Sequence, residues 1–397
     1  MKFDNKIIYP DYNNCIVNLS ASILQAFDVD TVHPALEQIN IAELKQKQNI
    51  VLLILDGFGL NLFKELKDST TSFFKPHLVD TITSVFPSTT SAAITSILTC
   101  RTPWEHGAIG WSLYFKEFAK FIDYLPNWDS ITAKTQDSIK YNTHDYLGGD
   151  NIFSMIHSKN PDVQTFNITR NGIDESANTI KNSGPAAIVG YKKIDHLFKN
   201  LNKILKKKSS QRRFIYAYSA DPDHQEHLNG VGSEQVNNFL EEVVVQLIKL
   251  KKKLAGSNTT ILISADHGLV NVGKYYYTNE DKELFDSMIM PTFPEPRFIS
   301  FFIKKHKEEQ FLKAVKKYED DFLFFSREEF IEKQLLGFGD AHPKIDDFLG
   351  DYFLVAKSDK AMKSIYIQNG KWKKEFAAHH AGLTSGEMQV PLFRIVL

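Results

Sequence analysis

The chain of 397 residues is 43% hydrophobic and 24% charged, and its formal net charge is -1 at pH 7. This composition is typical of a globular protein and excludes a general attraction to nucleic acid or to an anionic membrane, so an anionic substrate must be bound by local groups. The two cysteines, Cys15 and Cys100, are too few for a disulfide framework or a thiolate-rich zinc site, and any metal ligands must therefore be His, Asp or Glu.

Strand and helix patterns alternate along the chain. Uninterrupted apolar runs predict buried strands at residues 49–55, 82–86, 214–218 and 259–265. Helical patterns lie between them at residues 91–98, 194–208 and 236–256. Strands that are apolar on both faces are typical of a sheet covered by helices on each side. We therefore expect an α/β fold with a central, mostly parallel sheet flanked by helices on both faces.

The chain has no internal repeat and no low-complexity linker, which favours a single catalytic domain over residues 1–397. Residues 107–160 and 272–350 are richer in Pro, Gly and aromatic side chains, and we expect them to form insertions beside the active-site edge of the sheet. The N-terminus lacks the apolar stretch of a signal peptide, and the longest aliphatic run, residues 50–55, is too short to span a bilayer. These features predict a cytoplasmic protein, with signal-independent export left open, and they do not address its oligomeric state.

Acidic side chains follow three of the predicted strands. Asp56, Asp221, Asp223 and Asp266 each lie within a few residues of a strand end, and His267 directly follows Asp266. In an open parallel sheet the carboxyl ends of the strands share one edge, so these side chains should converge. Carboxylates gathered in one place repel one another, and a bound cation is the simplest physical explanation. Each motif alone also fits a turn or a helix cap, and only their combination favours a metal site.

Two further segments offer candidate ligands. The first is SADPDHQEHLNG at residues 219–230, in which Asp223 and His227 are four residues apart, so that one helical turn places both side chains on the same face. The second lies near the C-terminus, where one of the adjacent histidines His379 and His380 could complete a metal site. Either segment alone also fits a solvated polar surface.

A cluster of hydroxyl side chains, FPSTT at residues 86–90, lies between the second strand and the following helix. Thr90 is expected at the start of this helix, where free backbone N–H groups and the positive end of the helix dipole attract an anion such as phosphate. By itself this is also the pattern of an ordinary helix cap. Beside metal ions the alcohol could act as a nucleophile, because coordination lowers its pKa.

The motifs LDGFG, FPSTT, PDHQEH, SADHG and HHAG occur in this order and cover most of the chain. They resemble the type I phosphodiesterase and nucleotide pyrophosphatase branch of the alkaline phosphatase superfamily. The resemblance implies a parallel-rich sheet sandwiched by helices, with two metal ions at its carboxyl edge. Mixed Asp and His ligands suit Zn²⁺, with Mn²⁺ as the alternative.

The resemblance also implies a nucleophile and the ligands of a first metal ion. Asp56, Asp266 and His267 resemble the family's ligands of the ion that also binds the oxygen of Thr90. Thr90 would attack phosphorus and expel the leaving group, and water would then hydrolyse the phosphothreonine with net retention of configuration. Two cations about 4 Å apart would stabilise the charge on the phosphate oxygens.

For the second metal ion, the family pattern selects Asp223 and His227, together with a late histidine. His380 matches this position better than the adjacent His379, and the choice between them stays open. The remaining polar residues of the first segment are expected outside the ligand set, as a cap of the turn (Asp221) or as solvated or supporting groups (His224 and Glu226).

The segment after the nucleophile helix departs from the family pattern. His106 keeps the family's position and is expected to have a structural role, whereas Trp111 stands where the family has an Asn that contacts the phosphate. Trp111 could stack on an aromatic leaving group such as a nucleobase, or could equally pack in the core. Arg170, Asn171 and Lys274 are candidate replacements for the phosphate contact, although loop residues of this kind are more often at the surface.

We therefore expect a metal-dependent hydrolase of phosphoric esters, most simply a phosphodiesterase or nucleotide pyrophosphatase that acts on a small phosphoester such as a nucleotide. A phosphomonoesterase or phosphonate hydrolase of the same superfamily would share the metal ligands and differ in the shape of the pocket. A catalytically inactive metal-binding interaction module is the alternative from another class. The complete ligand set and the intact Thr90 argue against that alternative, and nothing indicates a nucleic-acid or membrane partner.

Overall fold

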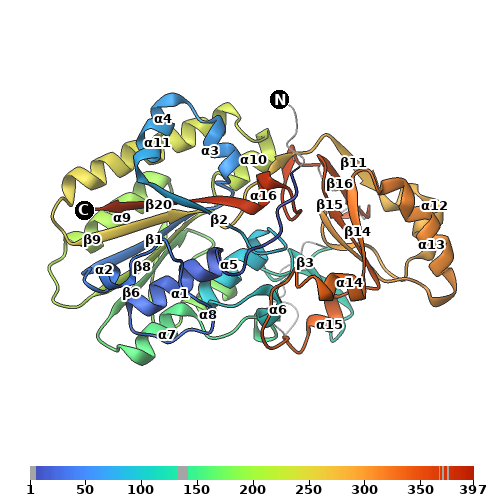
Figure 1. Ribbon diagram of the computed structural model, residues 1–397, viewed down its shortest axis with the longest axis horizontal. Coiled ribbons are helices and arrows are strands. Elements are labelled where there is room, and N and C mark those ends of the chain that lie inside the picture. Colours follow the sequence, from blue (N-terminus) through green and yellow to red (C-terminus); the bar gives the residue numbers. More distant parts are fainter. Residues whose placement is uncertain (1–5, 133–141, 366, 369–370, 373–374) are drawn as a thin grey trace.

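In the computed structural model of the protein, a seven-stranded sheet lies between two layers of helices (Figure 1). The structure describes residues 6–132, 142–365, 367–368, 371–372 and 375–397. The strands of the sheet lie in the order β2 (Leu78–Thr83), β20 (Gln389–Val396), β9 (Thr259–Ser264), β1 (Asn49–Leu55), β8 (Arg213–Ser219), β6 (Gln164–Arg170) and β7 (Ala187–Tyr191). The strands from β9 to β7 are parallel, and β20 runs antiparallel to both β9 and β2. The predicted α/β fold with a mostly parallel sheet is confirmed.

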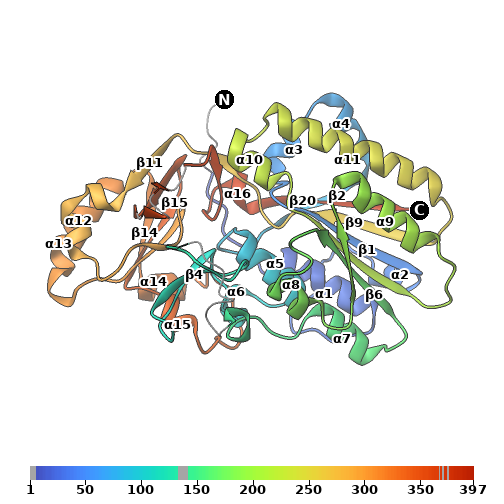
Figure 2. The same ribbon diagram turned by 180° about the vertical axis from the view of Figure 1, so that it is seen from behind.

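Helices cover both faces of this sheet, as the two opposite views show (Figures 1 and 2). One layer contains α1 (Ile16–Ala26), α2 (Ile41–Lys45), α5 (Thr90–Thr99), α7 (Ile152–Lys159) and α8 (Ala177–Ser183). The other contains α3 (Leu60–Glu65), α4 (Asp68–Phe74), α9 (Ile194–Lys206) and α11 (Glu234–Lys253). The three predicted helices correspond to α5, α9 and α11. None of the helices in the described residues combines the length and apolar character needed to span a bilayer, and the cytoplasmic location stays a prediction.

Three of the four predicted strands are confirmed as β1, β8 and β9, and the strand expected at residues 82–86 is largely wrong. β2 begins earlier, at Leu78, and ends at Thr83. The chain then leaves the sheet edge, and Phe86 packs edge-on against Phe298, with ring centroids 5.0 Å apart. Phe86 therefore belongs to a second core, whereas Ile82 and Val85 pack in the core of the central sheet. Strands β6, β7 and β20 were not predicted.

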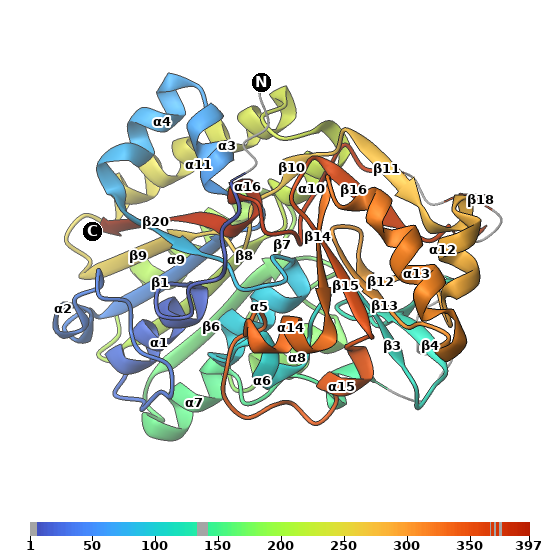
Figure 3. The same cartoon turned by 45° about the vertical axis from the view of Figure 1, so that its right-hand side comes forward.

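A second group of strands lies beyond the carboxyl edge of the central sheet (Figure 3). An antiparallel sheet contains β12 (Phe293–Glu295), β13 (Phe298–Phe301), β15 (Tyr352–Ala356) and β14 (Phe322–Ser326). A three-stranded sheet contains β3 (Ser112–Phe115), β4 (Lys120–Asp123) and β5 (Trp128–Asp129). Short pairs join β10 (Val270–Asn271) to β19 (Ala378–His379), β11 (Lys274–Tyr277) to β16 (Lys360–Lys363), and β17 (Ile367–Gln368) to β18 (Lys371–Trp372).

These strands have their own helices and their own apolar cores. The helices are α6 (Pro103–His106), α12 (Lys282–Ser287), α13 (Glu308–Val315), α14 (Arg327–Glu332) and α15 (Ile345–Phe348). Two clusters of buried side chains lie here, separate from the cluster around the central sheet. We call this part of the molecule the strand lobe, defined by β3 to β5 and β11 to β16. Much of the strand lobe comes from residues 107–160 and 272–350, the two ranges expected as insertions. The organisation of the chain as a single domain stays a prediction.

Candidate metal centre and its cavity

The acidic side chains converge because the three central strands end at the same level. β1 lies between β8 and β9, and Leu55 pairs with Ser219 while Ile54 pairs with Ser264. The chain stays in contact beyond the strand ends, since the N–H of Asp56 donates to the carbonyl of Ser219 at 2.9 Å, and the N–H of Asp223 donates to the carbonyl of Asp56 at 2.8 Å. Register alone therefore brings the residues that follow these strands to one place.

Glycine makes this close approach possible. Gly57 has a φ of +78°, a conformation that few other residues adopt, and a Cβ at this position would lie 2.8 Å from the Cα of Asp223. In SADHG, a Cβ at Gly268 would lie 2.9 Å from the Cα of Gly59. The glycines of LDGFG and SADHG therefore allow the three segments that carry the aspartates to pack backbone against backbone.

Asp56, Asp266 and His267 form a first group of possible ligands, whose ligand atoms all lie within 4.8 Å of one another. His267 Nε2 lies 3.5 Å from Asp56 Oδ1 and 3.4 Å from Asp266 Oδ2. The other ring nitrogen, Nδ1, lies 3.2 Å from the carbonyl oxygen of Gly268. If Nδ1 carries the proton and donates it to that carbonyl, Nε2 presents its lone pair to the carboxylates, which is the arrangement of a metal-binding histidine.

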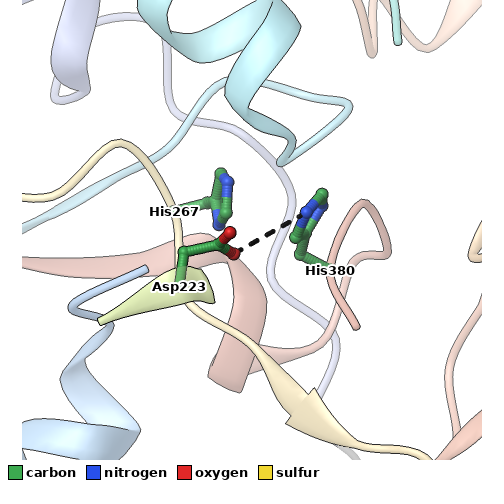
Figure 4. A group of neighbouring side chains, drawn as sticks. All are labelled: Asp223, His267 and His380. Atoms are coloured by element: carbon green, nitrogen blue, oxygen red, sulfur yellow. Dashed lines mark ion pairs between the residues drawn. The ribbon is translucent and has the colours of Figure 1, made fainter. Parts of the chain in front are cut away.

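Asp223, His267 and His380 form a second group with the same 4.8 Å limit (Figure 4). The carboxylate of Asp223 lies beside both imidazoles, whose ring centroids are 4.2 Å apart, and its Oδ1 lies 3.9 Å from His380 Nε2. His227 approaches the same oxygen at 3.4 Å through Nε2, and its Nδ1 lies 2.8 Å from the carbonyl oxygen of Ala378. His379 belongs to neither group within the described residues.

α10 (Asp223–Asn229) and the loop before α16 (Ser385–Met388) position the second group. As the spacing predicted, one helical turn of α10 brings the side chains of Asp223 and His227 together. Glu387 stabilises the loop that carries His380, because its Oε1 accepts the N–H of Gly382 at 2.8 Å. Glu387 in turn forms a fully buried, bidentate ion pair with Arg297, at 2.6 and 2.9 Å.

Burial and like charge make this group of carboxylates costly on its own. Burial raises the pKa of Asp56, and the charges on Asp266 and Asp223 raise it further. Burial likewise raises the pKa of Asp223. Asp56 Oδ1, Asp223 Oδ1 and Asp266 Oδ2 are buried and accept no hydrogen bond from the described residues. Among those residues, the ion pairs of these three aspartates are formed only with histidines.

The histidines are in the form that binds metals. Burial lowers the pKa of His267 and of His380, and it lowers the pKa of His227 to about 4. The three imidazoles are therefore neutral at physiological pH and do not compensate the carboxylates. A divalent cation would satisfy the orphaned oxygens and offset their repulsion, so the side chains present here fit metal ions.

Thr90 lies beside these groups as the first residue of α5. Its side chain is buried, and Oγ1 lies 3.1 Å from His267 Nε2. The hydroxyl therefore reaches the same nitrogen as the carboxylates of the first group. Because the first N–H groups of a helix have no partner within the helix, this end of α5 also favours an anion.

A cavity of about 870 Å³ opens onto Thr90, Asp223, His227 and His380. Its walls come largely from the strand lobe and are rich in aromatic side chains, namely Trp111, Trp128, Tyr277, Phe293 and Phe376. A space of this size can hold a ligand as large as a nucleotide. The cavity thus places an apolar, aromatic surface next to the polar centre.

The four residues expected to bind the substrate have different places. Trp111 lines the cavity. Arg170 ends β6 and lies 4.0 Å from Asp221, the N–H of Asn171 donates to the carbonyl of Tyr191 at 2.8 Å, and Lys274 Nζ lies 4.5 Å from the ring centre of Tyr276. The described residues that line the cavity do not include Arg170, Asn171 or Lys274.

Three further expectations concern neighbouring side chains. Asp221 does not cap the turn as expected, because α10 starts after Pro222 without a side-chain cap and Asp221 faces Arg170 instead. His224 is exposed, whereas Glu226 is fully buried. His106 is buried away from the metal groups, with Nε2 2.9 Å from Ser96 Oγ and Nδ1 accepting the N–H of Ala108 at 3.1 Å, as a structural role requires.

Sequence reasoning missed three residues around this centre. The hydroxyl of Tyr218 donates to Asp56 Oδ2. The sequence did contain a signal for this contact, because Tyr218 lies one residue before the end of the strand next to β1. Glu295 and Lys363 line the cavity from the strand lobe. Each belongs to a short strand without a recognisable motif, so the sequence offers no signal for them.

Comparison with known proteins agrees with this arrangement. Residues 50–349 match the model of the type I phosphodiesterase/nucleotide pyrophosphatase family, and the chain belongs to this family. It is accordingly an enzyme of the phosphodiesterase and nucleotide pyrophosphatase type, a branch of the alkaline phosphatase superfamily. The sequence has no significant match among curated proteins.

Solved structures of similar fold include two kinds of enzyme. Murine ectonucleotide pyrophosphatase/phosphodiesterase 5, solved as an inactive variant in complex with AMP, matches with a TM-score of 0.63 and 15% identity over 87% of each chain. Phosphonoacetate hydrolase from Sinorhizobium meliloti, in complex with phosphonoformate, matches with a TM-score of 0.63 and 17% identity over 88% of this chain and 90% of that one. At this level of identity the likeness shows the fold alone.

Proposed function

We propose that the protein is a metal-dependent phosphodiesterase in which Thr90 is the nucleophile and two metal ions bind the converging Asp and His side chains. Asp56, Asp266 and His267 would hold one ion, which also contacts Thr90. Asp223, His227 and His380 would hold the other ion. The observation that carries this proposal is the approach of the Thr90 hydroxyl to within 3.1 Å of His267 Nε2, beside three aspartates that each have a buried oxygen without a hydrogen bond from the described residues.

The side chains would divide the reaction between them. When bound, two divalent cations, Zn²⁺ in our proposal with Mn²⁺ as the alternative, lower the pKa of an alcohol and neutralise phosphate charge. Thr90 Oγ1 gives up its proton and attacks phosphorus, the bond from phosphorus to the leaving oxygen breaks, and the leaving group takes up a proton, so that Thr90 carries the phosphoryl group. Water then attacks phosphorus and gives up a proton, the bond from phosphorus to Thr90 Oγ1 breaks, and Thr90 takes up a proton as the product leaves. Two inversions at phosphorus give net retention of configuration.

The aromatic cavity supports a small phosphoester, such as a nucleotide, as the substrate. Trp111, Trp128 and Tyr277 offer ring faces on which a nucleobase can stack. Murine ectonucleotide pyrophosphatase/phosphodiesterase 5, whose fold this chain shares, was solved with AMP.

Hydrolysis of paired substrates tests the proposal. Zinc-loaded protein should cleave bis(4-nitrophenyl) phosphate with a higher kcat/KM than 4-nitrophenyl phosphate. Thr90→Val, which removes only the hydroxyl, should lower kcat/KM for the diester by about a thousandfold or more. Thr99→Val makes the same change at the other end of α5 and should leave the rate unchanged.

The results that contradict the proposal point to specific alternatives. Full activity of Thr90→Val would remove Thr90 as the nucleophile. A preference for the monoester would favour a phosphomonoesterase, and failure to cleave either ester with Zn²⁺ or Mn²⁺ would favour an inactive metal-binding module.

A phosphonate hydrolase is the second candidate function, because phosphonoacetate hydrolase shares this fold over 88% of the chain. Such an activity would use the same metal ligands and would differ in the walls of the cavity. Release of inorganic phosphate from phosphonoacetate, measured beside the two esters, decides between the candidates.

A further inference from the structure

Asp123 is a buried carboxylate in the wall of the cavity, on the middle strand of the three-stranded sheet. It ends β4, where it pairs with Ser112 of β3 on one side and with Trp128 of β5 on the other. Directly paired residues of antiparallel strands carry their side chains on the same face of a sheet. All three residues also line the cavity. This face of the sheet therefore presents Asp123 to a ligand, with a tryptophan beside it.

Two hydroxyl groups fix the orientation of this carboxylate. Its Oδ1 accepts the hydroxyl of Ser112 and, at 2.6 Å, the hydroxyl of Ser130. Among the described residues, the hydrogen bonds donated to the Asp123 side chain all go to Oδ1. An ionised carboxylate has about four lone-pair sites. The two hydroxyls use those of Oδ1, so Oδ2 can accept two donors from a ligand in the cavity.

The sheet that carries Asp123 begins next to the proposed nucleophile. The hydroxyl of Thr89, which directly precedes Thr90, and the backbone N–H of Trp111 both donate to Oε1 of Glu295, at 2.6 and 2.7 Å. Trp111 directly precedes β3, and β5 lies two strands from β3, or about 10 Å at the usual spacing of strands. The wall from Trp111 to Trp128 thus starts beside Thr90 and is long enough to contact the nucleoside part of a nucleotide whose phosphate lies at Thr90.

The nucleobases differ in the donors that they offer to such an acceptor. Guanine has two neighbouring donors on one edge, its N1–H and its N2 amino group. In adenine and cytosine the amino group lies beside a ring nitrogen that only accepts, and in uracil the N–H lies between two carbonyl groups. An ionised carboxylate repels these acceptors, because it has no proton to donate to them. Guanine is therefore the base whose edge fits Asp123 when its ring stacks on Trp111 or Trp128.

We propose that Asp123 is a specificity-determining residue that selects guanine nucleotides, by accepting the N1–H and the N2 amino group of the base. The inference rests on the proposed function and names the substrate class of the same cavity. Hydrogen bonds to an ionised acceptor are about twice as strong as those between neutral groups. A base without the matching donors leaves the buried acceptor unpaired, so we expect guanine to be preferred over adenine by about tenfold or more.

The first test compares substrates that differ only in the base. With zinc-loaded protein, kcat/KM for guanosine 5′-(4-nitrophenyl) phosphate should exceed that for the adenosine ester by about tenfold or more. The inosine ester, which keeps the N1–H but lacks the N2 amino group, should lie between them. Equal values for the guanosine and adenosine esters would overturn the inference.

The decisive variant is Asp123→Asn. Its amide oxygen can still accept the hydroxyls of Ser112 and Ser130, and its amide nitrogen then places a donor where Oδ2 was. The preference for guanosine over adenosine should be lost or reversed. An unchanged preference would contradict the role of Asp123. An equal loss of activity on both esters would also contradict it, because that result indicates a contact with the shared ribose or a purely structural role.

Asp129→Asn is the matched control, because it makes the same change on the same sheet at a position outside the described residues that line the cavity. Its amide oxygen can still accept the N–H groups of Ile131 and Thr132, at 3.0 and 2.9 Å. The ratio of the two kcat/KM values should stay within about twofold of the wild type. A shift as large as that of Asp123→Asn would mean that the ratio responds to the sheet as a whole, which contradicts the inference.

A binding measurement separates this inference from the proposed function. In a Thr90→Val background, calorimetry with GMP and AMP needs no turnover, and the two ligands share the same ribose and phosphate. GMP should bind about tenfold or more tighter than AMP, and adding Asp123→Asn should remove this difference. Wild-type protein that cleaves none of the esters would refute the proposed function, whereas equal binding of GMP and AMP refutes the role of Asp123. Thermal unfolding of each variant confirms that it is folded.

Discussion

Replacing Asp56 with Asn should stabilise the protein when metal ions are absent. Asp56 and Asp266 belong to a group whose ligand atoms lie within 4.8 Å of one another, and both are almost fully buried. Asn has the same shape and can still accept the hydrogen bond from Tyr218, so the substitution removes mainly the charge. Removing one of two facing carboxylates relieves their repulsion and the cost of burying a charge.

The size of the effect follows from the spacing of the carboxylates. At 4.8 Å, the largest separation between ligand atoms within the group, and an effective dielectric constant near 20, two like charges repel by about 3 kcal/mol. The net gain from the substitution is no larger than a few kcal/mol, because the wild-type site can take up a proton instead. With an unfolding entropy of about 2 cal/mol/K per residue, 1 kcal/mol corresponds to about 1 °C for a chain of 397 residues. We therefore expect Tm to rise by about 1 to 4 °C in Asp56→Asn at pH 8 with a chelator.

The gain should depend on pH and on metal. The pKa of Asp56 is raised in the folded state, so the folded wild type binds a proton that the unfolded chain releases. The stability of the wild type relative to the variant therefore grows as pH falls through the raised pKa. The advantage of the variant is thus largest at pH 8 and shrinks toward pH 5. With saturating Zn²⁺ the order should reverse, because binding to the native state stabilises the wild type more.

Differential scanning calorimetry of both proteins, with and without chelator, measures these differences. Asp162→Asn removes an exposed carboxylate and should leave Tm unchanged in every condition. A chelated Asp56→Asn protein that melts at or below the wild type at pH 8, with native circular dichroism, would show that the carboxylates do not repel one another and would remove the physical argument for a metal centre.

Three further predictions concern the surroundings of the centre. His380→Ala should lose about one equivalent of zinc by elemental analysis after dialysis, whereas His379→Ala should retain it; the opposite result would exchange their roles. Arg297→Met leaves the carboxylate of Glu387 buried without its partner and should lower the free energy of unfolding by about 3 to 5 kcal/mol in urea titrations, with part of the loss recovered by adding Glu387→Gln. Tyr218→Phe removes the donor to Asp56 and should weaken zinc binding by about tenfold or more in chelator competition; unchanged affinity would show that this contact does not orient the ligand.

The parts of the fold that could be predicted from sequence are those specified by local pattern. β1, β8 and β9 are apolar on both faces because helices cover both, and this produces runs that are easy to recognise. The aspartates at their ends follow from the same pattern combined with the rule that parallel strands share a carboxyl edge. β7 lies at the sheet edge with most of its residues exposed, so it lacks the apolar signal that identifies a buried strand.

The remaining features depend on contacts between distant segments. Glu295 contacts Thr89 across 206 positions of the chain, and Arg297 reaches Glu387 across 90. A pair of this kind leaves no periodicity or spacing in the sequence. The strand expected at residues 82–86 failed for a related reason, because the apolar side chain of Phe86 packs in the strand lobe, whose existence the local pattern did not reveal.

The centre and the cavity are built from different parts of the chain. The candidate ligands and Thr90 follow strands of the central sheet or lie in the loop before α16, whereas the aromatic walls come mainly from the strand lobe. Such a division makes the lobe an exchangeable module for protein engineering. Replacing β3 to β5 with the corresponding strands of a relative should change the walls of the cavity, whereas β12 has to be kept, because Glu295 at its end contacts Thr89 beside Thr90. Directed evolution of new substrate ranges should accordingly collect its mutations in the lobe.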